Sequence, residues 1–366
     1  WSSDVCSSDL VVSTADPVVM PLSQQNSRAP SFAVLSLNPA VDRVIYLHSA
    51  LASGGLNRAI ATRLDPGSKG LNVATLLSRL GCDVEYYSFS GGIYGAFCEE
   101  RISGEMIRSY FVRTSCGLRE NVKIIDGDDV CTELNTRGGP YSEAECESLI
   151  SALAGTRAGV VCLCGSIPQG VEKGVYNSLI AKLREKGKIC VLDCDGEAMK
   201  LGIEAFPDII KPNLREAEEL FISSGLEICS DYRVIPVENP WEKYGKTRRN
   251  VPEAAEKAAA MCGEISEFFS VRVLCTLGGD GAICAEPGNK DVLFCPAPHV
   301  AMRGFAGAGD SFLAAYLSSF FSESYKNDGA RALVRAVAAG SAKVTIDGSG
   351  IPDAEAVDKM MSGTTS

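Results

Sequence analysis

The sequence predicts an α/β protein built on a doubly wound, mostly parallel sheet. Short apolar runs alternate with amphipathic helical patterns along most of the 366 residues. Such an alternation places buried strands between helices that cover both faces of one sheet. Polar or Gly-rich clusters follow the ends of these runs, where open α/β sheets bind ligands. A hairpin pattern around Asp126–Asp129 breaks the rhythm and predicts a second, smaller sheet.

The strand patterns are short apolar or alternating runs that end at Gly, Pro, Asn or Asp. We expect strands at 32–37, 41–47, 56–64, 84–90, 121–125, 130–135, 159–164, 189–193 and 271–277, and a strand end at 209–213. The patterns at 41–47 and 56–64 are more polar than the others. We expect them to join the hairpin strands in the small sheet.

The helix patterns carry apolar residues at helical spacing. They lie at 73–81, more weakly at 95–108, and at 143–153, 175–185, 197–203, 215–221, 254–269, 311–321 and 328–345. The segment 225–252 has no apolar periodicity and contains Pro236, Pro240 and Pro252. We expect it to be a surface loop or insertion.

Composition excludes several classes of protein. The formal net charge is −11 and the largest basic cluster is Lys246–Arg249, so we expect no nucleic-acid partner. The chain has 15 cysteines without a Cys-x-x-Cys pair, and His48 and His299 are its only histidines. This pattern argues against a zinc site and for a reducing, cytoplasmic location. No apolar run reaches membrane-spanning length. Residues 1–30 are polar and aperiodic, and their start resembles a cloning scar.

The turn Gly304–Ser311 is the strongest candidate for a catalytic element. Its small residues leave backbone N–H groups unobstructed at a helix start, where unpaired donors and the helix dipole favour an anion. Asp310 would repel that anion unless it removes a proton from a hydroxyl that attacks a phosphoryl group held by the amides. The alternative is a glycine turn in which Asp310 only caps the helix.

Other polar clusters follow strand ends, which share one edge of a parallel sheet. The loop Pro66–Asn72 opens a helix and is a second candidate anion site, although it lacks P-loop spacing. Asn213 and Glu216 fit a ligand site, but they also fit a helix cap with a first-turn acid. The clusters expected to converge are Asn38 with Asp42, Gly165 with Ser166, Asp193, Lys211 with Asn213 and Glu216, Gly278–Gly281, and Gly307–Asp310.

Five stretches resemble motifs of the ribokinase-like sugar kinases, the phosphofructokinase B family, in the same order along the chain. They are Leu37–Asp42, Pro66–Ala74, Gly165–Val171, Lys211–Glu216 and Gly307–Ser311. The Asn-Pro-Ala-x-Asp opening and the Arg-x-Asn-Val-Lys-Ile stretch from Arg119 resemble the sugar-phosphate branch, which includes 1-phosphofructokinase and tagatose-6-phosphate kinase. The similarity runs from about residue 33 to about residue 347.

This resemblance implies a three-layer αβα sandwich with a small β-sheet lid. The kinase domain would span 31–366, with lid strands from about 41–65 and 119–135 and a homodimer joined through the lid. The resemblance also implies Mg²⁺-dependent transfer of the ATP γ-phosphoryl group to a hexose phosphate. We expect the reaction to convert fructose 1-phosphate to fructose 1,6-bisphosphate.

The motifs also imply a role for each site residue. Asp310 would be the base, and the anion hole would be formed by Gly307, Ala308 and Gly309. The hexose phosphate would be held by Asp42, Gly67, Ser68, Lys69, Asn72 and Arg119, with Lys69 and Arg119 on its existing phosphate. ATP would be bound by Lys211, Asn213, Glu216, Thr276, Gly278, Gly281 and Gly340, with Ala339 and Ser341 flanking adenine. Mg²⁺ would be held through water by Asn213 and Glu216.

The chain departs from the family pattern at Ser68, Tyr94 and Phe305, which bear on the choice of sugar and on the shape of the nucleotide site. Tagatose 6-phosphate and fructose 6-phosphate therefore stay open as alternative acceptors. A nucleoside is disfavoured as the acceptor, because Lys69 and Arg119 would be cations placed for a phosphate. A different class of protein would be a non-catalytic sugar-phosphate sensor on a kinase scaffold. The presence of Asp310 and of the ATP-site residues argues against that class.

Overall fold

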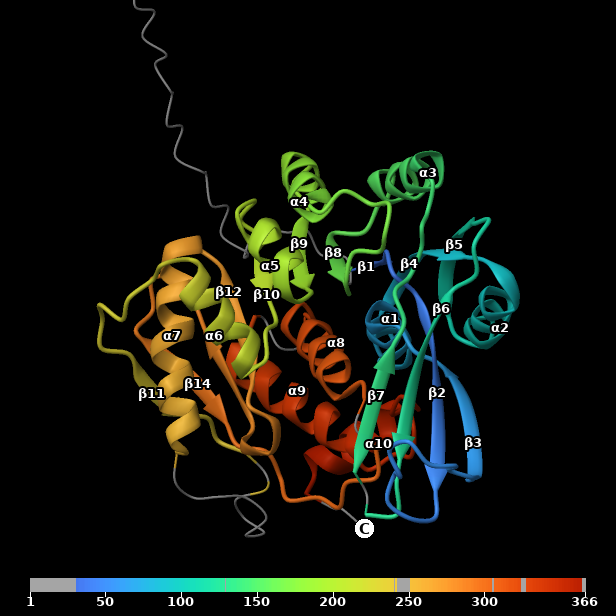
Figure 1. The fold of residues 1–366 in the computed structure, drawn as a ribbon. Helices are drawn as coiled ribbons and strands as arrows, with labels where there is room; N and C mark the ends of the chain where they lie inside the picture. Colours follow the sequence, from blue (N-terminus) through green and yellow to red (C-terminus); the bar gives the residue numbers. More distant parts are fainter. Residues whose placement is uncertain are drawn as a thin grey trace, which may run out of the picture.

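The computed structural model describes residues 31–128, 130–239, 241, 251–304, 306–323 and 327–363. The expected scar at 1–30, the basic cluster at 246–249 and Phe305 lie outside these residues. A 10-stranded sheet, in the order β11-β14-β13-β12-β10-β9-β8-β1-β4-β5, forms the centre of the described chain. A 4-stranded sheet stands beside it and forms the lid (Figure 1).

The large sheet is parallel except where β13 joins it. Its inner strands read as continuous apolar runs because helices cover both of their faces. The strands are β1 Ser31–Ser36, β4 Asp83–Ser90, β5 Ile107–Arg113, β8 Val160–Cys164, β9 Ile189–Asp193, β10 Ile209–Ile210, β11 Arg233–Pro236, β12 Arg272–Thr276, β13 Ala282–Ala285 and β14 Asp291–Cys295.

Two apolar cores lie on opposite faces of this sheet. In β1, Ala33 and Leu35 point to one core, whereas Phe32 and Val34 point to the other, as strand geometry requires. The first core is covered by α3 Glu143–Ala154, α4 Val175–Glu185, α5 Gly196–Ile203, α6 Leu214–Ser223 and α7 Glu253–Phe269. The second is covered by α1 Lys69–Arg79, α2 Gly92–Ile102, α8 Ala308–Phe320, α9 Gly329–Val344 and α10 Ala354–Met361. The predicted three-layer α/β class is therefore confirmed.

The lid is the small sheet that the hairpin pattern predicted. Its strands are β2 Ala40–Leu47, β3 Ala59–Pro66, β6 Arg119–Ile125 and β7 Cys131–Asn135, in the order β3-β2-β6-β7. Tyr94 of α2 forms hydrogen bonds with two lid strands. Its hydroxyl donates to Glu120 Oε2 of β6 at 2.6 Å and accepts from Arg43 Nη2 of β2 at 3.2 Å. Tyr94 thus connects α2 to the lid strands.

Three features differ from the sequence-based expectation. The helix expected over 95–108 ends at Ile102, because Ser103-Gly104 interrupts the helical pattern, and β5 follows it. A further helix, α10, follows the N-cap Asp353. The segment 225–252 contains β11, which pairs in parallel with β14, and the buried Trp241, whose Nε1 donates to the carbonyl of Met360 at 3.0 Å. This part of the segment packs on the body, and its strand is too short to show a period.

No helix in the described ranges is both long and apolar enough to cross a membrane.

Candidate active site

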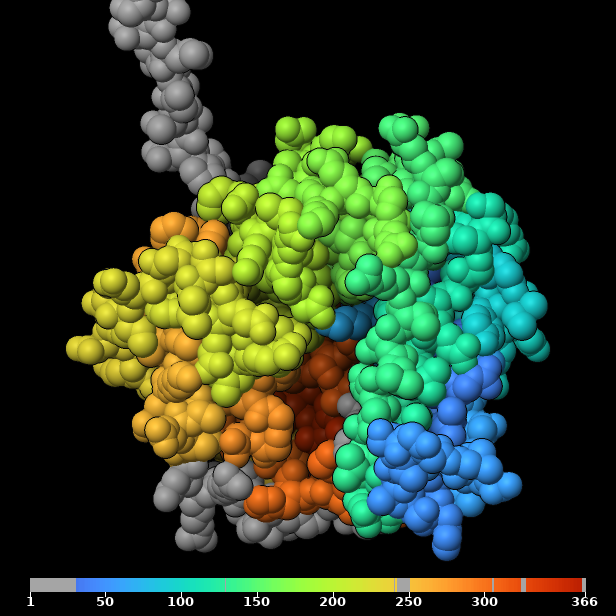
Figure 2. Space-filling view, in the orientation of Figure 1, coloured from blue at the N-terminus to red at the C-terminus, as the bar shows by residue number. Residues whose placement is uncertain are grey.

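A hollow between the lid and the carboxyl edge of the large sheet holds the polar clusters. Figure 2 shows it in the centre of the view, with the lid in green and blue on one side and the yellow and orange segments on the other. Blue atoms from the region of α1 and red atoms from the C-terminal helices lie at its floor (Figure 2). The strand ends that the sequence placed on one edge therefore surround one concave site.

The start of α8 supplies an open set of backbone donors. Gly307 is the N-cap with φ +85°, a conformation that favours glycine, and no side chain caps the helix there. The N–H groups of Ala308, Gly309 and Asp310 are in the first turn, where no carbonyl of the helix can accept from them. A Cβ on Gly309 would lie 3.3 Å from Lys211 Nζ, so this cation faces the same turn.

Asp310 is buried at this turn and lies close to opposite and like charges. Asn72 Nδ2 donates to Asp310 Oδ2 at 2.8 Å. Burial first, and then the charge of Asp193, raise the pKa of Asp310 to about 6, although Lys69 and Lys211 oppose this shift. A carboxylate with this pKa is ionised at neutral pH and is still basic enough to accept a proton from a hydroxyl.

Asp193, at the end of β9, holds two lysines at the floor of the site. Its fully buried Oδ1 lies 3.3 Å from Lys211 Nζ and 3.5 Å from Lys69 Nζ. Asp193 is also the main cause that raises the pKa of Lys69, so this ammonium stays charged. The Oδ2 atom of Asp193 is buried and accepts no hydrogen bond within the part of the chain that the structure describes. The sequence placed Asp193 at this edge without giving it a role.

Asp42 is the centre of a second network, on the lid side. Its carboxylate accepts from Asn121 Nδ2 at 3.0 Å, from Lys123 Nζ at 2.6 Å and from Ser349 Oγ at 2.8 Å. Gly67 packs directly against it, and a Cβ there would lie 2.2 Å from Asp42 Oδ1. Only glycine allows the 66–69 loop to approach Asp42 this closely.

The sequence motifs assigned no role to Asn121, Lys123 or Ser349. A signal for the first two was present, because Arg119, Asn121 and Lys123 alternate along β6 and so share one face of the lid sheet. Asn121 also stands opposite Asp42 in the β2–β6 pairing. Ser349 lies after α9, outside the regular elements, and carried no pattern of its own.

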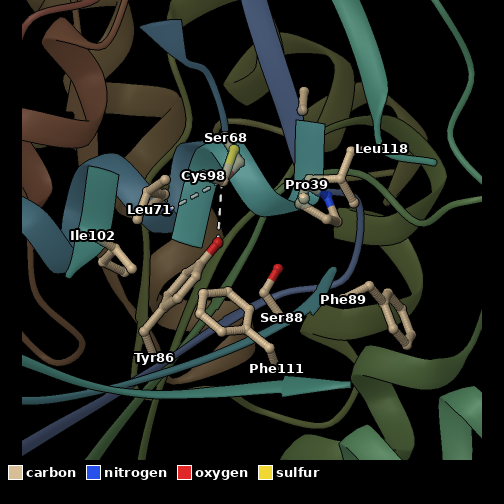
Figure 3. Close-up of a pocket in the computed structure, with 12 residues that line it drawn as sticks. Pro39, Ser68, Leu71, Tyr86, Ser88, Phe89, Cys98, Ile102, Phe111 and Leu118 are labelled. Carbon is tan, nitrogen blue, oxygen red and sulfur yellow. Dashed lines mark hydrogen bonds between the residues drawn. The ribbon is translucent and has the colours of Figure 1, made fainter. Parts of the chain in front are cut away.

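Ser68 points into the fold and away from the hollow. Its Oγ accepts from the backbone N–H of Leu71 at 3.4 Å and lies 3.3 Å from the hydroxyl of Tyr86, as Figure 3 shows. These side chains, with Ser88 and apolar neighbours, line a buried cavity of about 10 Å³, which is room for about one water. The side chain of Ser68 therefore caps α1 from within.

Arg119 and Lys69, expected to hold one phosphate together, form contacts with different partners. Arg119 Nε donates to the carbonyl of Asn38 at 3.3 Å, and its Nη1 donates to Asn121 Oδ1 at 2.8 Å. Burial lowers the pKa of Arg119, which the charge of Asp42 partly opposes, whereas the charge of Asp193 raises the pKa of Lys69.

A pocket of about 370 Å³ adjoins the α8 turn on the body side. It is lined by the expected Thr276, Gly278, Gly281, Gly340 and Ser341, together with Ala308 and Gly309. Ala339 is fully buried and does not line it. The loop residues Ala297, Pro298, His299, Val300 and Met302 also line the pocket, and the sequence carried no motif that identified them. Because Ala308 and Gly309 belong to its lining, the pocket adjoins the anion turn.

Asn213 and Glu216 stand at the N-terminus of α6 beside Thr276. They form a capping box, in which Asn213 Oδ1 accepts from the N–H of Glu216 and Glu216 Oε2 accepts from the N–H of Asn213, both at 2.9 Å. The helix-cap alternative is therefore realised. The cap leaves Glu216 Oε1 without a hydrogen bond to the described residues, and such a carboxylate oxygen fits a water of a hydrated Mg²⁺.

Comparison with known proteins agrees with this fold and site. Residues 35–356 match the model of the pfkB family carbohydrate kinase, and the chain belongs to this family. It is similar to the 1-phosphofructokinase of Bacillus subtilis, with 30% identity over 285 residues that cover 78% of this chain and 84% of the relative. It is also similar to the 1-phosphofructokinase of Rhodobacter capsulatus, with 31% identity over 286 residues that cover 77% of this chain and 81% of the relative. The protein is accordingly a carbohydrate kinase.

Solved structures establish the ribokinase-like fold. The structure of phosphofructokinase-2 from Escherichia coli in complex with substrates and products has a TM-score of 0.75 and 22% identity, and the match covers 91% of this chain and 98% of that one. A ribokinase from Thermotoga maritima has a TM-score of 0.67 and 18% identity over 90% of this chain and 99% of that one.

Proposed function

We propose that the protein phosphorylates fructose 1-phosphate with ATP to give fructose 1,6-bisphosphate. The observation that carries this proposal is the position of Asp310, an ionised carboxylate with a pKa of about 6 beside the open N-terminus of α8. The sugar kinase family supports the reaction class. The 1-phosphofructokinase names of the relatives support the choice of acceptor.

In this proposal Asp310 accepts the proton of the acceptor hydroxyl, which then attacks the γ-phosphoryl group of ATP. The amides of Ala308 and Gly309 and the ammonium of Lys211 stabilise charge on that group, since they converge on the same turn. Asn72 keeps Asp310 oriented through its 2.8 Å hydrogen bond. ATP occupies the pocket between Thr276 and Gly340, so that its phosphates reach the start of α8.

Mg²⁺ would be held at Glu216 and Asn213 through water, and it would supply charge neutralisation of the ATP phosphates. The available Oε1 of Glu216 is the feature that fits this role.

The lid side holds the sugar phosphate in this proposal. Asp42 accepts from sugar hydroxyls, and Gly67 keeps the loop close to it. The existing phosphate is bound by Lys69 and Arg119, and we add Lys123, which shares a face of β6 with Arg119. A cluster of cations on a lid strand is the chemistry expected for a phosphorylated acceptor and not for a neutral sugar or nucleoside.

The decisive experiment measures ADP release from Mg·ATP with fructose 1-phosphate, fructose 6-phosphate, tagatose 6-phosphate, fructose and a nucleoside. Preference for fructose 1-phosphate is the expected result. Preference for another ketose phosphate would replace the acceptor and keep the mechanism. Turnover of unphosphorylated sugars alone would contradict the roles of Lys69 and Arg119. Binding of sugar phosphate without any turnover would identify a sensor.

We also propose a homodimer that forms through the lid. The outer half of β3 is exposed along its length, and four apolar side chains of the lid region, Leu56, Ile60, Val130 and Leu134, are between 55% and 76% exposed. Light scattering should give twice the chain mass, and Ile60→Asp with Leu134→Asp should give a monomer. A parent protein that is monomeric at micromolar concentration contradicts this interface.

The free cysteines, most of them buried, support a reducing, cytoplasmic location.

A further inference from the structure

Lys343 is a fully buried lysine behind the anion turn. It belongs to the last turn of α9, which packs along α8 (Figure 1), and its exposed fraction is 0%. Its Nζ donates to the carbonyl of Gly348 at 2.9 Å. No carboxylate of the described residues forms an ion pair with it. Lys211, in contrast, is buried beside the carboxylate of Asp193.

A buried ammonium without a carboxylate partner destabilises a fold. Burial is the main cause that lowers the pKa of Lys343 to about 8, and the nearby Lys123 adds to the shift. A methionine would fill a similar volume at the end of α9 without this penalty. The position therefore carries a charge that packing does not require.

The ammonium lies between two turns. In front is the segment that leads into α8, where a Cβ on Gly304 would lie 3.2 Å from Lys343 Nζ and a Cβ on Gly307 would lie 3.4 Å from Lys343 Cε. Behind is the turn after α9, whose Gly348 carbonyl accepts from the ammonium. The N–H groups of Arg303 and Gly304 also donate to the carbonyl of Val344, at 2.7 and 3.1 Å. Lys343 thus fills the junction that sets the position of Gly307.

Charged groups from three other elements act on Lys343. Asp310 of α8 and Asp65 of β3 favour its charged form, whereas Lys123 of β6 and Arg63 of β3 oppose it. The ammonium is therefore within electrostatic range of the carboxylate that we assign as the base. A Cβ on Gly307 would also lie 3.3 Å from Nδ2 of Asn72, the hydrogen-bond partner of Asp310, so Lys343 and Asn72 both approach this turn.

We propose that Lys343 is a positioning residue for phosphoryl transfer, which holds Gly304 and Gly307 in place and adds its positive charge behind the anion hole. It touches no substrate, because the turn separates it from the site. The inference rests on the proposed function, since it concerns the same anion hole.

The test compares Lys343→Met with the parent in kinetics and in thermal unfolding. We expect kcat to fall by about 10- to 100-fold, because the turn is misplaced and the charge is lost, while the KM values for ATP and sugar phosphate change little. We expect the Tm to rise by about 2–4 °C, because a buried unpaired charge is removed. A purely structural lysine would lose stability together with activity, so the opposite signs identify the role.

Arg272→Met is the matched control. Arg272 is a buried cation at the start of β12, at the strand end remote from the site, and it pairs with Glu286 at 2.7 Å. Its removal should lower the Tm and leave kcat unchanged.

Lys343→Ala provides a second readout, because the space that the side chain leaves is lined by the Gly348 carbonyl and should accept a small cation. Methylammonium chloride should then raise kcat, and tetramethylammonium chloride at equal ionic strength should not.

Two results overturn the inference: a Lys343→Met protein with the parent's kcat, or one whose Tm and kcat both fall. Equal rescue of Lys343→Ala by both salts also overturns it. If the parent phosphorylates another ketose phosphate, the proposed acceptor fails and the same ratios of kcat still decide the role of Lys343. If the parent phosphorylates none of the sugars tested, the proposed function fails independently of the role of Lys343. In that case thermal unfolding still tests the inference: a Lys343→Met protein that is no more stable than the parent contradicts the argument that a destabilising charge is retained for function.

Discussion

Two helices begin at the same hollow, α1 and α8, and their N-termini are finished in different ways. At α1 the N-cap is Ser68, whose side chain accepts from the N–H of Leu71. At α8 the N-cap is Gly307, which has no side chain to offer. Both follow a strand–loop–helix pattern and both are rich in small residues, so the pattern alone does not separate them.

The difference in caps decides which helix start is available to a ligand. A serine cap satisfies a first-turn amide within the chain, whereas a glycine cap leaves these amides unpaired. The Asn213 capping box closes the start of α6 in the same way as Ser68 closes α1. Among these three helix starts, the one at α8 alone combines open amides with a buried carboxylate, Asp310, and with the cation of Lys211. The residue at the N-cap therefore identifies the anion site more specifically than the glycine content of the loop does.

The largest expected effect comes from Asp310→Asn, which removes the proposed base but keeps the open helix start. We expect kcat to fall by about 10²- to 10⁴-fold with near-normal substrate binding. Because the pKa of Asp310 is raised by burial, its ionised form destabilises the fold at neutral pH, and the asparagine variant should be more stable. Steady-state kinetics, calorimetric binding and thermal melts measure these three quantities.

Asp208→Asn is a suitable control for this change, since burial also raises the pKa of Asp208, which lies before β10 at the opposite edge of the sheet. It should leave kcat unchanged. Equal turnover in Asp310→Asn and the parent would falsify the assignment of the base.

The next effect in size comes from Gly307→Ser, which gives α8 the kind of cap that α1 has. Gly307→Ala is the control, because both variants share the strain of a side chain at φ +85° and the approach to Asn72 Nδ2 at 3.3 Å. We expect the serine variant to lose about 10²-fold in kcat and to be slower than the alanine variant, because its hydroxyl occupies an amide of the hole. Indistinguishable kcat values for the two variants would mean that strain, and not the cap, sets the loss.

A smaller effect follows from pH. Asp310 has to be ionised to accept a proton, so kcat/KM should fall about tenfold per pH unit below a pKa of about 6. The same group contributes stability to the fold below its unfolded pKa, and this contribution is lost as pH rises through about 6. Activity should therefore increase over the pH range in which this contribution to stability decreases. A kcat/KM that is the same at pH 5 and pH 8, where we expect about a tenfold lower value at pH 5, would assign the base elsewhere.

Much of the body was predictable because its signals are local. The alternation of buried strands and helices sets the fold class, and strand ends in a parallel sheet bring Asp193, Lys211 and Asp310 to one edge. The turn at Gly307 was identifiable because three small residues precede a helical pattern. β11 was missed because a strand of 4 residues shows too little periodicity, and α10 was missed although it is as long as α5, which the sequence did predict.

The lid side of the site was harder to predict because its contacts join distant segments. Ser349 reaches Asp42 across 307 positions of sequence, and no local pattern announces such a hydrogen bond. Lys123 was missed although its alternation with Arg119 was visible. The direction in which Ser68 points depends on Tyr86 of β4, which only the folded chain places beneath it.

The smallest effect should come from Ser68→Ala, the reverse test of the comparison. Because Ser68 faces Leu71 and Tyr86 and not the hollow, the loss of its cap should lower the free energy of unfolding by about 0.5–1 kcal/mol. The kcat and both KM values should stay within about twofold, since the Ser68 side chain contacts Leu71 and Tyr86 inside the fold and none of the polar groups of the hollow. Urea unfolding and the sugar-phosphate panel measure the two effects. If KM for the sugar phosphate rises about tenfold while stability is unchanged, Ser68 contacts the substrate, and the N-cap then no longer separates the closed helix start from the open one.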